Sequence, residues 1–282
     1  MENMRFLLDY KPKIAVNKGA PAAHAGDIVL DHVSFSYFGS EEKALDDVSL
    51  TIHEGEKLAV VGQNGAGKTT LTKLLLRLYD PTAGSISLDG TDIRDVELTS
   101  YRDLFATVLQ DYRHFSMSVK SNILLRREQD GDDAAVADAL RKSTADSFVD
   151  AFPNGADSIL DREFDDNGEV LSGGQAQMIS IAHVHAKGSP IVILDEPSSA
   201  LDPIAEQKMY ENMMASAEGK TVVFISHRMS ACTLADRIVV LDHGRVLECG
   251  SHAELMKKNG RYSELFRMQS EHYIESKTEE AC

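Results

Sequence analysis

A glycine-rich loop that carries one lysine and two threonines gives the strongest chemical signal in the sequence. Gly62 to Thr70 reads GQNGAGKTT, which fits the phosphate-binding pattern G-x-x-x-x-G-K-[ST]. Glycines let backbone N–H groups curl around phosphate oxygens, and the start of a following helix adds partial positive charge. We expect Lys68 to reach the β- and γ-phosphates of a nucleotide and the Thr69 hydroxyl to bind Mg²⁺, which prefers hard oxygen ligands. For Thr70 we expect a packing or capping role.

A pair of carboxylates forms the second chemical signal. Asp195 and Glu196 directly follow the apolar run from Ile191 to Leu194, which has the pattern of a parallel strand covered on both faces. Open α/β sheets bind ligands at the carboxyl ends of such strands. Asp195 suits an Mg²⁺ role through water, and Glu196 is placed to orient and deprotonate an attacking water. The alternative is a pair of solvated carboxylates at the start of a loop.

Short buried strands and helices are expected to position these groups. Lys57 to Val61 is apolar enough for a buried strand that leads into the glycines, and Leu71 to Leu78 continues as an apolar helix. A further buried strand is expected at 221–226, just before His227. The order of strand, loop and helix indicates an α/β fold.

A third motif decides the family resemblance. Leu171 to Gln175 reads LSGGQ and lies between the phosphate loop and the carboxylates. With it, the chain resembles the ATP-binding cassette (ABC) ATPases from about Asp27 to Met268. The resemblance implies an α/β fold with a P-loop NTPase core and mixed sheet, an antiparallel β subdomain and an inserted α-helical subdomain. It also implies ATP hydrolysis with Mg²⁺.

The resemblance assigns roles to single residues outside the phosphate loop. Tyr37 matches the aromatic that stacks on adenine, although an aromatic on an edge strand would look the same. Gln110 matches the glutamine that senses Mg²⁺ and the γ-phosphate. Asp202 ends the segment from Ser198 through which two cassettes communicate, and His227 matches the histidine that contacts the γ-phosphate.

The expected site therefore has three parts. The catalytic residues are Glu196, His227, Lys68 and Gln110. The metal is expected at Thr69, Gln110 and Asp195. The nucleotide is expected to be bound by Tyr37, Gly62, Asn64, Gly65, Ala66, Gly67, Lys68, Thr69, Thr70, Ser172, Gly173, Gly174, Gln175 and Asp202.

The LSGGQ motif implies a dimer. Its serine and glycine N–H groups are expected at the start of a helix, where they can bind a γ-phosphate. In the family this phosphate belongs to ATP bound to the opposite subunit, so each ATP is sandwiched between two cassettes. The sequence leaves open whether the second cassette is identical or different.

The chain is expected to divide into a linker and a cassette. Residues 1–26 resemble the connection that follows a transmembrane domain, with a short helix at Asn3 to Leu8, and 27–282 resembles the ABC nucleotide-binding domain. Within it we expect a helical subdomain at about 111–170 and C-terminal helices at about 251–282. In the helical subdomain, Asp132 to Lys142 has Ala, Val and Leu at helical spacing and is expected to form a helix. The transmembrane domain is expected either in the same polypeptide or in a separate subunit.

Several stretches resemble the exporter branch, namely Asp89 to Arg94, the Tyr101-Arg102 pair, Ser118 to Ile123 and Glu248 to Leu255. In exporters the region after Gln110 faces the transmembrane domain, so we expect this contact at Phe115 to Asn122, with local packing as the alternative. Met178 and His183 depart from the family, which usually has arginines there. The prediction is an exporter motor; the alternatives are an importer ATPase and a non-transport ABC ATPase.

Composition and charge limit the binding partners and the cellular compartment expected for the chain. The net charge of −16 and the lack of a basic stripe argue against nonspecific nucleic-acid binding. The three cysteines, Cys232, Cys249 and Cys282, have no C-x-x-C spacing and are expected to be buried or terminal thiols in a reducing compartment. No stretch approaches the roughly 20 apolar residues that cross a bilayer. Together with the resemblance to exporter cassettes, this implies the cytoplasmic face of a membrane, reached through a transmembrane partner.

Two other stretches carry side chains that can bind metals, but neither has the spacing of a metal site. Asp130 to Asp133 lacks the glycine and glutamate of a calcium loop and is expected to be a solvated helix start. His183 and His185 are two residues apart, so on a helix they point to different faces. For both histidines we expect a helix-surface or core role.

Overall fold

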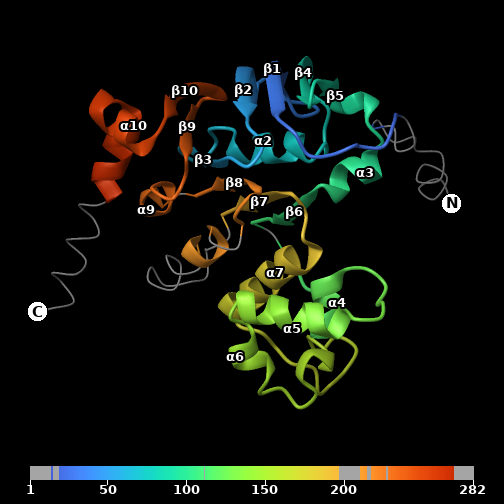
Figure 1. The fold of residues 1–282 in the computed structure, drawn as a ribbon. Helices are drawn as coiled ribbons and strands as arrows, with labels where there is room; N and C mark the ends of the chain where they lie inside the picture. The colour runs from blue at the N-terminus through green and yellow to red at the C-terminus, as the bar shows by residue number, and fades with distance from the viewer. Residues whose placement is uncertain are drawn as a thin grey trace, which may run out of the picture.

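The computed structural model describes residue 14 and residues 19–110, 112–196, 210–214, 217–226 and 228–269. Two β-sheets and a separate group of helices make up this part of the chain (Figure 1). Predictions for the helix at Asn3 to Leu8, for Ser198 to Asp202, for His227 and for Cys282 fall outside the described residues. The elements in chain order are β1 (Ile28–Phe35), β2 (Leu45–Ile52), β3 (Lys57–Val61), α2 (Lys68–Leu75), β4 (Ala83–Leu88), β5 (Thr91–Asp92), η1 (Ile93–Asp95), α3 (Leu98–Asp103), β6 (Phe105–Val108), α4 (Val119–Leu124), α5 (Asp132–Lys142), α6 (Asp146–Val149), η2 (Gly155–Asp157), α7 (Gly173–Lys187), β7 (Ile191–Asp195), β8 (Thr221–Ile225), α9 (Met229–Cys232), β9 (Arg237–Asp242), β10 (Arg245–Gly250) and α10 (His252–Lys258).

The larger sheet has six strands in the order β10-β9-β3-β8-β7-β6. Among the described strands, β9, β3, β8, β7 and β6 run parallel to one another, and β10 is antiparallel to its neighbour β9. The strands β3, β7 and β8 are almost wholly buried, as expected for parallel strands covered on both faces. Their carboxyl ends meet at one edge, which is where the phosphate loop begins.

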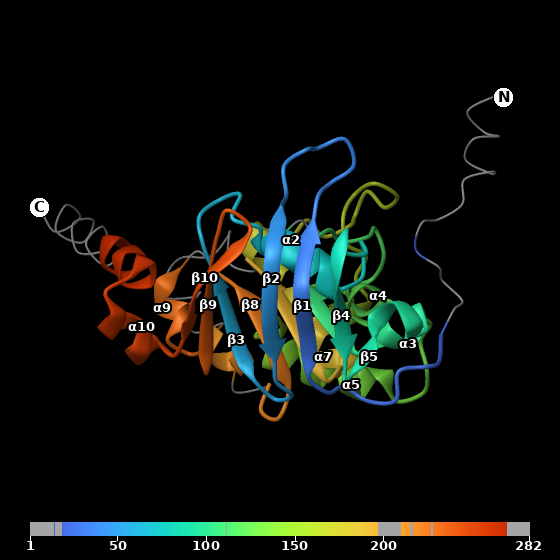
Figure 2. The ribbon, with the colours of Figure 1, turned by 90° about the horizontal axis from the view of Figure 1, so that it is seen from above.

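The smaller sheet is antiparallel, with the order β2-β1-β4-β5, and it lies over α2 (Figure 2). Leu71, Leu74 and Leu75 of α2 are buried in one apolar cluster with side chains from both sheets. Burying each such leucine stabilises the fold by about 1.5–3 kcal/mol. The helix that follows the phosphate loop is therefore held between two layers.

The opposite face of the larger sheet is covered by α7 and by the helical segment 210–214. Below it lie α4, α5 and α6, which share a third apolar cluster with Ile179 and Ala182 of α7 (Figure 1). Residues on one face of α7 thus pack against the sheet, and residues on another face pack against this group of helices. We call the segment from α4 to η2 the helical lobe.

The strongest periodic patterns predicted their elements well. The strand at Lys57–Val61 and the helix at Asp132–Lys142 are confirmed with the bounds read from the sequence. The helix expected at Leu71 to Leu78 begins earlier, at Lys68, and ends at Leu75. It ends there because Arg77 takes a left-handed conformation with φ of 48°.

The solvated helix start expected at Asp130 to Asp133 is wrong in one respect. A helix does begin at Asp132, but this carboxylate is only 6% exposed. It accepts hydrogen bonds from both terminal nitrogens of Arg126, at 2.9 and 2.7 Å, and from the Gln129 backbone N–H. The bidentate arginine lowers the pKa of Asp132, so the buried charge is compensated.

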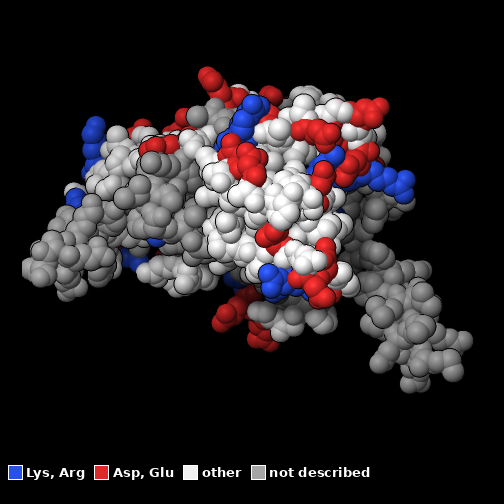
Figure 3. Space-filling view, turned by 90° about the horizontal axis from the view of Figure 1, so that it is seen from below, with Lys and Arg blue, Asp and Glu red and all other residues white. Residues whose placement is uncertain are grey.

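The face formed by the helical lobe carries charges of both signs (Figure 3). Acidic side chains are scattered over it, and its described residues show no continuous basic stripe. The prediction about nucleic acid remains a prediction. In the part of the chain that the structure describes, no helix is both long and apolar enough to span a membrane.

Candidate nucleotide-binding site

The register of the parallel strands brings the phosphate loop and the carboxylates of Asp195 and Glu196 to one sheet edge. In the register of β3 and β8, Val60 pairs with Ile225, and in that of β7 and β8, Asp195 pairs with the same residue. The phosphate loop leaves the end of β3, and Glu196 follows the end of β7. The lysine of the loop and the two carboxylates therefore belong to one site, as the sequence predicted.

The phosphate loop turns on glycines because side chains do not fit there. Gly67 has φ of 104°, and a Cβ on it would lie 2.6 Å from the Ala44 carbonyl oxygen. At Gly62 a Cβ would approach the Leu241 carbonyl oxygen to 2.3 Å. The tip of the loop, Gln63 to Gly65, is exposed, so its backbone is accessible to a ligand. Ala66 is buried beneath it.

Lys68 opens α2 and folds back over the loop. Its ammonium donates to the carbonyl oxygens of Gly62 at 2.8 Å and Gln63 at 3.1 Å. Burial lowers the pKa of Lys68, while the nearby charges of Glu196 and Asp195 oppose that shift. A buried cation whose hydrogen-bond partners among the described residues are carbonyl oxygens is prepared to bind an anion.

Asp195 meets the requirements of a magnesium ligand. It is 1% exposed, accepts a hydrogen bond from the Thr69 side chain, and its Oδ1 has no hydrogen-bond partner in the described residues. An orphaned carboxylate oxygen beside a hydroxyl offers the hard oxygen ligands that Mg²⁺ prefers. These residues fit the ion that the sequence predicted.

Burial first, and then the neighbouring Glu196 carboxylate, raise the pKa of Asp195 from 3.8 to about 6. Without metal, the folded state therefore binds a proton here more tightly than the unfolded chain does. The stability gained from protonated Asp195 is fully present below about pH 4 and is lost as the pH rises through about 6.

Asp195→Asn is expected to raise the melting temperature of the metal-free protein at pH 8, because a neutral amide replaces a buried charge. The difference from wild type should shrink by pH 5, where Asp195 is protonated. Thermal unfolding in EDTA at both pH values measures this. A lower melting temperature for the variant at pH 8 would contradict the assigned burial cost.

Glu196 sits in a strained turn directly after β7. It has φ of 48°, which is unfavourable for a residue other than glycine, and its backbone N–H donates to the Ile225 carbonyl at 3.0 Å. Such strain is found where a fold holds a side chain in a fixed position. The half-buried carboxylate lies close enough to influence the pKa of both Lys68 and Asp195.

Tyr37 lies beside the phosphate loop rather than on an exposed strand edge. The strand ends at Phe35, and the Tyr37 hydroxyl forms a 3.2 Å hydrogen bond with Thr70 Oγ1. Its ring packs edge-on against Phe35 and Tyr79, with centroid distances of 5.0 and 5.5 Å. Thr70 is buried, which agrees with the packing role expected for it; its place among the nucleotide-binding residues stays a prediction.

The LSGGQ motif forms a capped helix start. Ser172 caps α7, since its hydroxyl accepts from the Gln175 N–H at 3.3 Å and its own N–H donates to Gln175 Oε1 at 2.9 Å. Ser172 and Gly173 are exposed, and Gly174 and Gln175 are half-buried. The helix start expected from the sequence is therefore available to a ligand from outside the chain.

Gln110 is exposed in the turn that follows β6, on the same sheet edge as Asp195. The structure describes no contact of its side chain. Asp202 and His227 lie outside the described residues, so their predicted roles stay predictions.

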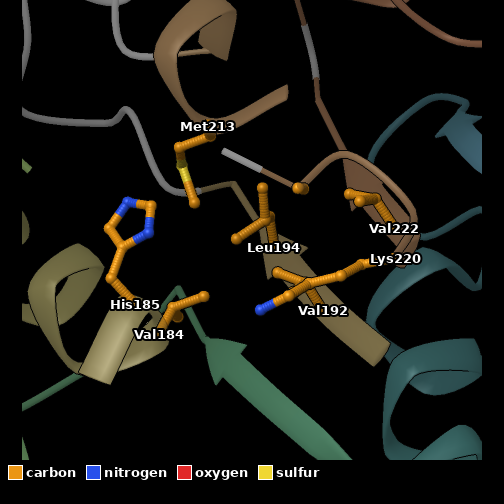
Figure 4. Close-up of a pocket in the computed structure, with 8 residues that line it drawn as sticks. Val184, His185, Val192, Leu194, Met213, Lys220 and Val222 are labelled. Carbon is orange, nitrogen blue, oxygen red and sulfur yellow. The ribbon is translucent and has the colours of Figure 1, made fainter. Parts of the chain in front are cut away.

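The two histidines of α7 point to different regions, as their spacing predicted. His183 Nδ1 donates to the Ile123 carbonyl of the helical lobe at 2.8 Å. His185 instead lines a cavity of about 10 Å³ with Val184, Val192 and Met213 among its walls (Figure 4). Burial lowers the pKa of His185 to about 4, so it is neutral at physiological pH. No metal-binding cluster occurs among the described residues.

Two residues at this site were missed by the sequence patterns. The Lys73 ammonium lies 5.6 Å from the centroid of the Tyr37 ring and also lowers the pKa of Asp195. Its position one helical turn after Thr70 was the only available signal. The Tyr112 hydroxyl donates to the Gly173 carbonyl at 3.0 Å, linking the segment after Gln110 to the LSGGQ helix.

The fold and the phosphate loop are those of a P-loop nucleoside triphosphatase. A family profile described as "ABC transporter" matches residues 45–199, which is more than half of the chain. The chain belongs to the ABC transporter family, and its fold is that of the ABC ATPase domain.

Relatives place the chain near exporters. An ATP-dependent lipid A-core flippase of Vibrio parahaemolyticus is 39% identical over 263 residues, covering 93% of this chain and 44% of the flippase. A protein of the same name from Thiobacillus denitrificans is 40% identical over 268 residues, covering 95% and 46%. The solved structure of a bacterial Atm1-family ABC exporter with ATP bound matches with a TM-score of 0.86 and 34% identity, covering 96% and 47%. The chain thus spans less than half of each of these proteins.

Proposed function

We propose that this chain is the ATP-hydrolysing motor of an ABC exporter. One observation carries the proposal: Lys68, Thr69, Asp195 and Glu196 lie together at one sheet edge, with a buried carboxylate oxygen that has no hydrogen-bond partner among the described residues. The likeness to flippases and to an exporter supports the direction of transport.

The chemistry follows from the positions of these groups. The glycine loop and Lys68 bind the phosphates of ATP, and Thr69 and Asp195 hold Mg²⁺. The ion neutralises charge on the transferred phosphate when it is bound. Glu196 Oε accepts the proton of the attacking water, and Lys68 stabilises the charge that develops on the phosphate. Gln110 and His227 are assigned to sensing and contacting the γ-phosphate.

The second cassette completes each site in this proposal. Ser172 and Gly173 are exposed at the start of α7, so the Ser172 hydroxyl and the glycine N–H groups bind the γ-phosphate of ATP held by the partner cassette. ATP then joins the two cassettes, and hydrolysis separates them. A ligand shifts such an equilibrium only through contacts made in one state, here the closed dimer.

In this proposal, the closure of the two cassettes is transmitted to a transmembrane domain at the cytoplasmic face of the membrane. Phe115 is 57% exposed, so local core packing does not account for it. Its backbone is fixed by Asn122, whose side chain accepts from the Phe115 N–H at 2.8 Å and donates to the Phe115 carbonyl at 3.0 Å. A rigid, exposed aromatic suits a contact with the transmembrane domain.

In the assembled transporter, Phe115→Ala is expected to reduce transport by about tenfold, the loss of about 1.4 kcal/mol at a buried contact, without lowering basal ATP hydrolysis. Transport and phosphate release are measured on the same vesicles. Leu247→Ala serves as the control, since Leu247 is similarly exposed, at 52%, on β10. Equal loss of transport and hydrolysis would argue against this contact.

A further inference from the structure

The last turn of α2 is held by side chains that come from α3. The Tyr101 hydroxyl donates to the Leu75 carbonyl at 2.6 Å. Arg102 donates to the carbonyls of Leu76 at 3.2 Å and Arg77 at 2.7 Å. The final carbonyls of a helix lack partners within the helix, and cations near them are favourable. Two neighbouring residues of α3 therefore satisfy three consecutive carbonyls at the end of the phosphate-loop helix.

A third side chain crosses in the opposite direction. Arg77 is 2% exposed, and its guanidinium donates to the carbonyls of Val96 at 3.1 Å and Arg94 at 3.3 Å. It also forms an ion pair with Asp80 at 3.2 Å. We call Arg77, Tyr101 and Arg102 the α2 clamp. Because the bonds run both ways, α2 cannot move relative to η1 and α3 without breaking several buried contacts.

Tyr101 is a permanent donor in this clamp. It is fully buried, and burial raises the pKa of its hydroxyl, which stays protonated. Its ring packs against Phe105 with a centroid distance of 5.0 Å. The hydroxyl is therefore fixed in position as well as in charge.

Residues 19–26, which we call the N-terminal strap, are bound to the same segment. The Ala20 N–H donates to the Asp95 carbonyl at 3.2 Å, and the Glu97 N–H donates to the Ala20 carbonyl at 2.8 Å. The Ala22 N–H donates to Ser100 Oγ at 2.9 Å. The strap runs beside β5 and α3 in both views (Figures 1 and 2). Its bonding partners are thus the residues immediately around the α2 clamp.

Gly19 lets the strap approach this closely. It has φ of 102°, and a Cβ there would lie 2.1 Å from the Asp95 carbonyl oxygen. That contact is with backbone, so no side chain can move aside to relieve it. Any substitution at Gly19 must push the strap away from η1.

We propose that Tyr101 and Arg102 are positioning residues for the phosphate-binding loop, and that the N-terminal strap strengthens ATP binding through them. When α2 is fixed at its last turn, Lys68 and Thr69 are already ordered before ATP binds. Less conformational entropy is therefore lost when the phosphates bind. Releasing the strap loosens η1 and α3, and with them the clamp. The coupling requires only that the site binds ATP; its use to carry a signal from the residues preceding the cassette rests on the proposed function.

Coupling of this kind is reciprocal, which gives it two readouts. Gly19→Ala is expected to weaken ATP binding about fivefold, and ATP should slow hydrogen exchange at the Ala20 and Ala22 amides by a similar factor in wild type. Arg102→Met should weaken ATP binding by a similar amount and abolish the effect of ATP on strap exchange. Arg102→Lys keeps the positive charge but replaces the forked guanidinium by a single ammonium. It should therefore restore only part of the affinity for ATP.

The experiment measures the ATP dissociation constant by calorimetry and amide exchange by NMR on the full chain. Gly219→Ala is the matched control, because Gly219 also has positive φ, at 75°, but a Cβ there meets no atom within 4 Å. The double variant of Gly19 and Arg102 should be no weaker than Arg102→Met alone, since both act through one element. Tyr101→Phe provides a second test that keeps the ring and removes only the donor.

Two results would overturn the inference. One is an unchanged dissociation constant in Gly19→Ala and Arg102→Met when their melting temperatures have fallen, which would leave a purely structural role. The other is additive effects in the double variant. If wild type itself binds no ATP, the proposed function fails as well; if wild type binds and the variants bind equally, only the coupling fails.

Discussion

Glu196→Gln is expected to lower kcat for ATP hydrolysis by about 10²- to 10⁴-fold, the usual contribution of a positioned general base. Glutamine keeps the size and the hydrogen-bonding reach of glutamate but cannot accept the proton of water. The strained backbone after β7, with φ of 48°, fixes the side chain next to Asp195 and Lys68. Phosphate release measures kcat, and calorimetry measures ATP affinity.

The affinity for ATP should stay within about threefold in this variant, because the carboxylate acts on water and makes no proposed contact with the nucleotide. Glu218→Gln is the control, since Glu218 lies in an exposed turn before β8. An unchanged kcat would remove Glu196 from the reaction. A large loss of affinity would instead indicate a role in binding.

Lys68→Ala is expected to weaken ATP binding by about 10- to 100-fold, since one hydrogen bond between charged groups contributes about 1.5–3 kcal/mol. Lys68 is 6% exposed, and the described partners of its ammonium are two carbonyl oxygens of the loop. Phosphate oxygens are stronger partners for a cation than carbonyls are. The loss should therefore fall on binding first, and it is measured by calorimetry with MgATP.

Two further variants test whether the loss of affinity depends on the ammonium of Lys68. Lys43→Ala removes a surface lysine that pairs with Asp46, and it should leave ATP affinity unchanged. Lys68→Arg keeps the charge in a larger group, and a cavity shaped for an ammonium should accept it poorly. Wild-type affinity in Lys68→Ala would show that the glycine loop binds phosphate without the lysine.

The sequence predicted those parts of the fold that depend on local patterns. The strand at Lys57–Val61 is a continuous apolar run followed by glycines, and the helix at Asp132–Lys142 has apolar residues at helical spacing. The burial of Asp132 was not predictable, because it depends on Arg126, which reaches it across a turn. A charged residue reads as solvated until its partner is known.

The site was predictable to a similar extent. Fixed spacing identified the phosphate loop, and an apolar strand that ends in two carboxylates identified Asp195 and Glu196. The α2 clamp was not predictable, since Tyr101 bonds a carbonyl 26 residues away and no local pattern carries that information. Tyr101 and Arg102 stood out only as features of the exporter branch, and their contacts emerge from the packing of α3 against α2.

The measurement that tests the central claim most directly is the size of the protein in solution with nucleotide. Glu196→Gln with MgATP, followed by size exclusion and light scattering, should form a dimer of twice 30.9 kDa, while wild type with ADP stays a monomer. This result would support an ATP sandwich between the phosphate loop and LSGGQ despite Met178 and His183. A monomer under both conditions, in a variant shown to bind MgATP, would contradict an ATP-driven dimer of this chain alone.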